Sequence, residues 1–280
     1  MDERHLIDAR ANLLATAQDY FIREPGVVGL FLGGSLPAGT ADAWSDIDLR
    51  VVVEAERHKS FVERRLEIPQ GWDGFLFNEW LEGALHCVSH FRPFLKIDIF
   101  YLDQSTFRPS PWLAQPIAIL HDRDGYLADI IGSSQGLAFA TDPADIDQSL
   151  GKGLAAAHET YRRIRRNDLI YAQSLLDELR FHMGRADDWI CRRPPQAVVL
   201  SRMDGRAGDA VLRAFSASYP PLERHAIEVS LGTLLQTYRQ QIVELHALFR
   251  PSRSLPHDLE AADLILREVP PPTSQRVTAM

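Results

Sequence analysis

The sequence predicts an α+β protein with a strand-containing N-terminal part and a helical C-terminal part. Two observations carry this prediction. Apolar runs of strand length occur before about residue 120, and helical periodicity takes over from about Pro143. The 280 residues are 45% apolar and 24% charged, as in a globular protein, and this length is sufficient for two ordinary domains.

The N-terminal part is expected to begin with an amphipathic helix over residues 2–22, because apolar side chains recur there at helical spacing until Pro25-Gly26. Further along, the pattern changes to short runs of apolar, β-branched and aromatic residues, which are typical of strands. Strands are expected at 27–32, 47–53, 94–102 and 117–120.

Three stretches between these strands are less regular. Residues 54–67 are charged and compatible with a helix, which Pro69-Gln70-Gly71 would end. Residues 72–91 fit a loop, a hairpin or a substrate-binding loop. Residues 126–140 are expected to be a connector to the helical part.

In the C-terminal part, apolar residues recur at helical spacing, which predicts a helical bundle. Helices are expected at 146–166, 169–191, 207–218, 222–249 and 258–267. The Pro-rich residues 269–280 are predicted to form a disordered tail. The domain boundaries are therefore placed at 1–140 and 141–268.

The most informative stretch lies between the first two strands, where a Gly33-Gly34-Ser35 turn is followed by Asp46 and Asp48. Residues two apart in a strand point to the same face, so the two carboxylates project together. Such a pair favours a cation between its members, and Mg²⁺ binds one or two carboxylates together with substrate phosphates. The glycines let backbone N–H groups approach an anion, and Ser35 adds a hydroxyl donor. This combination predicts chemistry on a nucleoside triphosphate.

A further carboxylate, Asp98, lies in the middle of an apolar strand, on the face that also carries Lys96 and Phe100. Burying an unpaired charge is costly, so Asp98 needs a partner. The partner is either Lys96 or a nearby arginine, or a metal ion held by the upstream Asp-x-Asp pair. The upstream motif favours the metal. Asp103 is an alternative third carboxylate, although aspartate at a strand end is usually a turn or cap residue.

Gly34-Ser35 followed by Ser45-Asp46-Ile47-Asp48-Leu49 resembles the signature of the nucleotidyltransferase superfamily of the DNA polymerase β type. Within it, the chain is most similar to the small bacterial aminoglycoside and lincosamide nucleotidyltransferases. The resemblance covers residues 30–53, with a weaker match near 95–103. It implies a catalytic domain with a small mixed sheet, followed by a helical substrate-binding domain.

The resemblance also implies a reaction. Two Mg²⁺ ions among Asp46, Asp48 and Asp98 would support in-line attack on the α-phosphorus, with Asp98 as a metal ligand or general base. Gly34 and Ser35 would hold the β- and γ-phosphates of ATP or another triphosphate. The expected reaction moves AMP onto a hydroxyl of a small molecule such as an aminoglycoside, which is a form of antibiotic resistance.

Contacts to the triphosphate and the acceptor are less defined. Arg50 and Lys152 are candidates for the triphosphate, although a solvated or structural role is favoured for both. Candidates for the acceptor are Trp72, Asp73, Glu79, Trp80, Glu82, Asp177 and Glu178, again with a structural or solvated role favoured. His86 and His90 have zinc-ligand spacing if helical, but no third ligand matches them.

Two alternatives keep parts of this hypothesis. The acceptor could be a protein or a tRNA end, as in toxin-like nucleotidyltransferases, or the chain could be a non-catalytic nucleotide-binding module. The formal net charge of -8 argues against a stable nucleic-acid partner. The basic run over residues 162–166 is the densest in the chain and lies on one helix end. The chain is expected to be a monomer or a homodimer.

The compartment is expected to be the cytoplasm. Cys87 and Cys191 lie far apart and match no metal or redox spacing, so free thiols in a reducing compartment are expected. The charged first residues lack the apolar core of a signal peptide. No apolar run approaches the ~20 residues that a membrane span requires.

Overall fold

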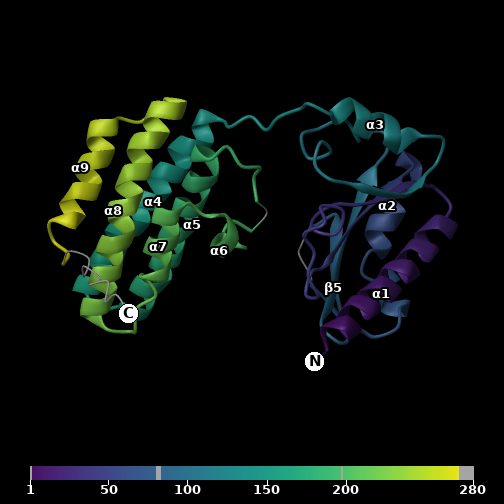
Figure 1. Ribbon diagram of the computed structural model, residues 1–280, viewed down its shortest axis with the longest axis horizontal. Helices are drawn as coiled ribbons and strands as arrows, with labels where there is room; N and C mark the ends of the chain where they lie inside the picture. The colour runs from purple at the N-terminus through teal and green to yellow at the C-terminus, as the bar shows by residue number, and fades with distance from the viewer. Residues whose placement is uncertain (1, 80–82, 197, 271–280) are drawn as a thin grey trace, which may run out of the picture. The chain divides into compact units, whose positions relative to one another are not determined.

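A computed structural model of the chain describes residues 2–79, 83–196 and 198–270 (Figure 1). It has the predicted α+β architecture and divides into two compact units, Met1–Ala138 and Phe139–Met280. Over the part of the chain that is described, no helix is both long and apolar enough to cross a membrane. Of the predicted disordered tail over 269–280, Val269 is instead buried in the core of the second unit, and residues 271–280 lie outside the described residues.

The first unit contains a mixed sheet with the strand order β3-β4-β5-β2-β1-β6. In chain order its elements are α1 Glu3–Arg23, β1 Val27–Leu32, β2 Ile47–Val53, α2 Ala55–Arg64, a 3-10 helix η1 Ile68–Gly71, β3 Phe75–Glu79, β4 His86–Phe91, β5 Leu95–Asp103, β6 Ala118–Asp122 and α3 Tyr126–Ser134. Strands β2 and β5 run parallel, and the other neighbouring strands run antiparallel.

The two faces of the sheet differ in cover. One face packs against α1 and α2, where side chains such as Phe21, Phe61 and Tyr101 are almost fully buried (Figure 1). On the other face, α3 and the loop before β6 cover the end around Phe31 and Val52. The remainder of this second face, over the neighbouring strands β2, β5, β4 and β3, carries polar side chains and aromatic rings. We call this area the open face.

Two expectations for this unit are decided by local contacts. Within residues 72–91, strands β3 and β4 pair antiparallel, with Asn78 opposite Ser89, so the expectation of a hairpin is confirmed for the described part. The expected connector over 126–140 is wrong in its first part, because residues Tyr126–Ser134 form α3. The Asp122 carboxylate accepts hydrogen bonds from the backbone N–H groups of Leu127 and Ala128, at 2.8 and 3.0 Å, and so satisfies donors of the first helical turn.

The second unit is the predicted bundle. Its helices are α4 Pro143–Arg165, α5 Leu169–Ile190, α6 Met203–Arg206, α7 Asp209–Ser216, α8 Arg224–Phe249 and α9 Leu255–Leu266. Helices α4, α5 and α8 pack on one another around fully buried side chains such as Leu176, Leu234 and Tyr238 (Figure 1). The short helix α6 was not expected from the sequence.

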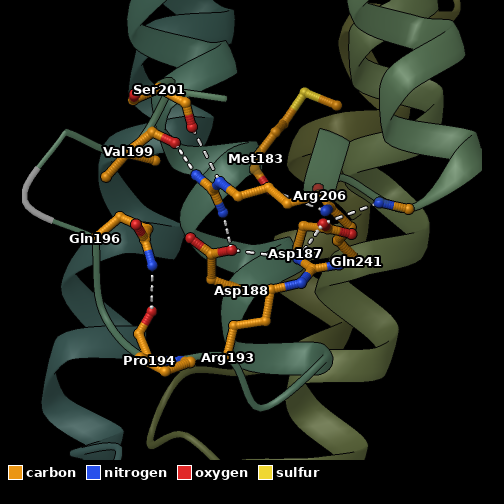
Figure 2. A network of polar contacts seen from close by, with 11 residues as sticks. Met183, Asp187, Asp188, Arg193, Pro194, Gln196, Val199, Ser201, Arg206 and Gln241 are labelled. Carbon is orange, nitrogen blue, oxygen red and sulfur yellow. Dashed lines mark hydrogen bonds and ion pairs between the residues drawn. The ribbon is translucent and has the colours of Figure 1, made fainter. Parts of the chain in front are cut away.

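A buried set of charges ties the end of α5 to the segment that contains α6 (Figure 2). Arg193 donates to Asp187 at 2.6 Å and to Asp188 at 3.2 Å. Arg206 donates to Asp188 and to the carbonyls of Val199 and Ser201. These contacts connect residues from 187 to 206 within the second unit. We call this set the Asp187/Asp188 cluster.

Candidate functional site

The Gly-Gly-Ser turn packs directly against the carboxylate that follows it. The Gly33 N–H donates to the Asp48 carbonyl at 3.0 Å and extends the β1–β2 ladder by one residue. Gly34 has a φ of 72°, and a Cβ at this position would lie 2.1 Å from Asp48 Oδ2. Only glycine combines a positive φ with this close approach. The Ser35 hydroxyl makes no hydrogen bond to the part of the chain that the structure describes.

A cation that sequence reasoning missed fixes the loop in front of Asp46. Arg10, buried on α1, donates to the carbonyls of Asp42 at 2.6 Å and Ser45 at 2.9 Å. The Ser45 hydroxyl in turn accepts from the Asp42 N–H at 2.9 Å. A signal for Arg10 was present, since it interrupts the apolar stripe of α1 between Leu6 and Leu13. Arg10 thus holds the loop so that Asp46 enters β2 in a defined position.

The parallel pairing of β2 with β5 brings the three predicted carboxylates to one place. Asp48 and Asp98 are register partners, and Asp46 lies two residues before Asp48. Lys96 contacts Asp46 and Asp98: its Nζ is 2.7 Å from Asp46 Oδ2 and 3.2 Å from Asp98 Oδ2. The remaining carboxylate, Asp48, accepts from Arg50 Nη1 at 3.2 Å through Oδ1.

Asp98 is the least compensated member of the set. Burial raises its pKa, the adjacent Lys96 lowers it, and Asp46 and Asp48 raise it again, so the net pKa lies above its ordinary value. Its Oδ1 atom is buried and has no hydrogen-bond partner among the residues that the structure describes. For Lys96, burial lowers the pKa, but the contacts with Asp46 and Asp98 outweigh it and leave the pKa raised.

The fit of this site to a divalent cation depends on Lys96. Three carboxylates on one face, one with an unpartnered buried oxygen, are the hard oxygen donors that Mg²⁺ requires. With the side chains as they lie, no group of three or more His, Cys, Asp or Glu side chains is placed to hold a metal ion within residues 2–79, 83–196 and 198–270. The ammonium group of Lys96 lies where Asp46 and Asp98 come together. The donor chemistry therefore fits a divalent cation, and the lysine competes for two of the donors.

Arg50 lies between the turn and the carboxylates. Its guanidinium stacks over the Phe100 ring, 4.3 Å from the centroid, and contacts Asp48. It also lies 3.8 Å from where a Cβ of Gly33 would be. Of the two cations suggested for the triphosphate, Arg50 lies beside the Gly33-Gly34-Ser35 turn. Lys152 is exposed on α4 of the second unit.

Beyond Arg50, the open face carries two stacked pairs of planar side chains. His86 stacks on Phe100 with ring centroids 4.9 Å apart, and Phe77 stacks on His90 at 4.4 Å. Glu79 contacts His90 at 2.7 Å. Because both histidines lie on strand β4, four residues separate them by about 13 Å, and the helical spacing considered for a zinc site does not apply.

The other candidates have separate surroundings. Trp72 is 8% exposed and packs against Phe91 in the core, which is the structural role favoured from the sequence. Asp73 is exposed, and Trp80 and Glu82 lie outside the described residues. In the second unit, Asp177 contacts the buried Arg180, and Glu178 is mainly exposed. The Asp103 carboxylate accepts from the N–H and hydroxyl of Ser105, as a turn residue does.

Comparison with known proteins adds a likeness of fold. The sequence matches no protein-family model. It also matches no curated protein. An aminoglycoside 6-adenyltransferase from Bacillus subtilis is similar in structure over 95% of this chain and 98% of its own, with 12% identity and a TM-score of 0.42. A nucleotidyltransferase-like protein from Exiguobacterium sibiricum 255-15 is similar over 90% of this chain and 88% of its own, with 15% identity and a TM-score of 0.42. At these values, the chemistry of the site has to be derived from its own residues.

Proposed function

We propose that this chain is a metal-dependent nucleotidyltransferase that moves AMP from ATP onto a hydroxyl group of a small molecule. The observation that carries the proposal is the contact of the Gly34 turn with Asp48, together with the pairing of Asp48 and Asp98 on adjacent parallel strands. A phosphate-binding turn and a set of carboxylates are needed together where a polyphosphate is bound through a divalent cation.

The turn would bind the end of the triphosphate. Gly33 is committed to the β1–β2 ladder, so the N–H groups of Gly34 and Ser35 and the Ser35 hydroxyl are the donors for the β- and γ-phosphates. The Arg50 guanidinium adds positive charge on the side of the turn that faces the carboxylates. Charge-assisted hydrogen bonds from arginine to phosphate are among the strong ones in proteins.

Asp46, Asp48 and Asp98 would hold Mg²⁺, which supplies charge neutralisation on the triphosphate and lowers the pKa of the attacking hydroxyl. Asp98 Oδ1 is the atom suited to take the proton of that hydroxyl, because it is buried beside the other two carboxylates and has no hydrogen-bond partner among the described residues. As the proton moves to Asp98, the acceptor oxygen bonds to the α-phosphorus and the bond to pyrophosphate breaks.

The acceptor would approach from the open face, because the opposite face of the sheet is covered by α1 and α2. We favour a polycationic, aminoglycoside-type acceptor. Two observations support it: the chain carries a formal net charge of -8, and the open face offers aromatic rings next to carboxylates. Glu79 at the far end of this face provides a further carboxylate.

The test is an assay of pyrophosphate release with ATP and Mg²⁺ against a panel of aminoglycosides and lincosamides, with tRNA in a parallel reaction. We expect release that depends on one class of small molecule, with the labelled α-phosphate recovered on that molecule. Pyrophosphate release that depends on tRNA would mean that the acceptor is a tRNA and that the proposed transfer of a nucleotide still takes place. If no nucleoside triphosphate raises the melting temperature of the chain in the presence of Mg²⁺, the proposal is contradicted.

A further inference from the structure

The position of Lys96 bears on how many metal ions the proposed nucleotidyltransferase site holds. The side chain contacts the carboxylate of Asp46, directly before β2, and that of Asp98 on its own strand β5. It engages Oδ2 of Asp46 and Oδ2 of Asp98, two of the three carboxylates that the predicted pair of ions would use. An ion bound by both carboxylates through these atoms therefore has to displace the ammonium.

The charges of the site work against that displacement. Asp46, Asp48 and Asp98 are compensated by two cationic side chains, Lys96 and Arg50, which leaves a single carboxylate charge uncompensated. Before the triphosphate adds its own negative charge, a first divalent cation already exceeds this charge. A second one would lie beside the displaced ammonium, whose side chain is only 34% exposed. Since like charges repel more strongly where water is partly excluded, the second ion binds at a disadvantage.

The residue type fits this position. The chain has three lysines, Lys59, Lys96 and Lys152. Its other permanently charged cationic side chains are arginines. A lysine ammonium is a compact point charge that contacts two carboxylates at once, as a metal ion does, whereas the planar guanidinium prefers one carboxylate in a bidentate geometry. In a chain with 27 arginines and three lysines, a lysine occurs at the point where one cation contacts two carboxylates.

We propose that the Lys96 ammonium takes the place of one of the two divalent cations, so that a single divalent cation binds with the nucleotide. This inference rests on the proposed function and departs from the two ions that the resemblance implies. Lys96 and Arg50 do not contact Asp46 Oδ1 or Asp48 Oδ2, which remain for that single ion, and Asp98 Oδ1 remains for the proton of the reacting hydroxyl.

The number of bound ions is measured by titrating Mn²⁺ into the full chain with a non-hydrolysable ATP analogue and following free Mn²⁺ by electron paramagnetic resonance. We expect one Mn²⁺ per chain. Lys96→Met removes the charge at nearly the same length and should raise the number to two. Lys96→Arg keeps a cation and should leave it at one. Lys59→Met is the matched control, because Lys59 is exposed on α2 and pairs with Glu63.

The outcomes separate the inference from the function on which it rests. Two Mn²⁺ ions in the unaltered chain overturn the inference and leave the nucleotidyltransferase proposal standing. One ion in both the unaltered chain and Lys96→Met, with both folded by circular dichroism, also overturns it, because the lysine is then not what excludes the second ion. No Mn²⁺ bound in the presence of the analogue contradicts the metal dependence itself and removes both proposals.

Discussion

Each unit of this protein brings acidic side chains together, and the two sets are satisfied to different degrees. In the second unit, the Asp187 and Asp188 side chains are each 8% exposed and meet two guanidinium groups and a backbone N–H (Figure 2). In the first unit, Asp98 is 17% exposed, yet its Oδ1 has no partner among the described residues. The carboxylates of the second unit are fully paired within that unit. In the first unit, a carboxylate oxygen of Asp98 is left without a partner among the described residues and could bind a ligand.

The difference follows from what buried charge requires. A buried carboxylate is tolerated when its charge is paired and its lone pairs accept hydrogen bonds, so a fully paired set is expected wherever charge serves the fold. Burying an incompletely paired carboxylate lowers the stability of the fold, because no interaction within the chain offsets the free energy of desolvation. An incompletely paired set points to a ligand that completes it. The contacts of the Asp187/Asp188 cluster therefore indicate a structural role, and the unpartnered oxygen of Asp98 supports the proposed binding site.

The largest effect is expected from Asp48→Asn, which removes a charge from the incomplete set. Loss of a metal-binding carboxylate should cost about 4 kcal/mol of transition-state stabilisation, or about a thousandfold in kcat/KM, since metal ions contribute several kcal/mol. The melting temperature should change little, because the Asp48–Arg50 pair is partly exposed. Steady-state pyrophosphate release and thermal unfolding measure the two quantities.

The matched control for this prediction is Asp103→Asn, at the end of the same strand as Asp98, where the carboxylate caps a turn. Its turnover should stay close to that of the unaltered chain. Equal losses in Asp48→Asn and Asp103→Asn would mean that the assay reports a general weakening of the sheet and not the metal-binding carboxylates.

The reverse pattern is expected for Asp188→Asn in the complete set. Removing one member of a buried, hydrogen-bonded ion pair leaves its partners uncompensated and typically costs about 3–5 kcal/mol. Arg206 and Arg193 would both lose their contact with the charged carboxylate. We expect a large loss of stability in chemical denaturation of the helical unit, followed by far-UV circular dichroism. The affinity for a nucleotide should not change.

Glu260→Gln is the control for Asp188→Asn, because Glu260 is exposed on α9 and undergoes the same carboxylate-to-amide change. Its effect on stability should be within about 0.5 kcal/mol. If Asp188→Asn were equally mild, the Asp187/Asp188 cluster would not be the structural element that its contacts indicate.

The sequence was sufficient for the strands whose apolar residues are continuous or alternate with polar ones. Strands β1 and β2 have the predicted bounds, and β5 differs by one residue at each end, because Val, Ile and Phe on a buried face leave few alternatives. Helix α3 was missed because its first turn is satisfied by a side chain that precedes the helix by several residues, Asp122.

In the site, the sequence predicts which carboxylates share a face of their strand but not which cations accompany them. Parity along β5 puts Lys96 and Asp98 on one side, as expected. That Lys96 also reaches Asp46 depends on the register between β2 and β5, which is a tertiary property. The Arg10 contacts and the Asp187/Asp188 cluster likewise join residues through packing, and only the position of Arg10 in an apolar stripe signalled its role.

Gly34→Ala tests the contact between the turn and the incomplete set. The added Cβ would lie 2.1 Å from Asp48 Oδ2, and φ is 72°, so the turn and the carboxylate have to separate. We expect a loss of about 2 kcal/mol in nucleotide binding from displacement and strain together. Gly39→Ala isolates the strain, because Gly39 has a φ of 69° in the same loop and no atom within 4 Å of its added Cβ. Equal effects of the two substitutions would mean that the turn does not act through Asp48.

The smallest effect is expected from Ser35→Ala, which removes one donor and leaves the backbone of the turn in place. A hydrogen bond to a charged phosphate contributes about 1.5 kcal/mol, so the dissociation constant for ATP should rise about tenfold. Titration with a fluorescent ATP analogue measures this, and the stability of the chain should stay constant because the hydroxyl has no partner among the described residues. Ser60→Ala, on the exposed surface of α2, is the control. An unchanged affinity in Ser35→Ala would mean that the turn binds phosphate through its backbone N–H groups alone. A loss of stability would show that the hydroxyl serves the fold, as the carboxylates of the Asp187/Asp188 cluster do.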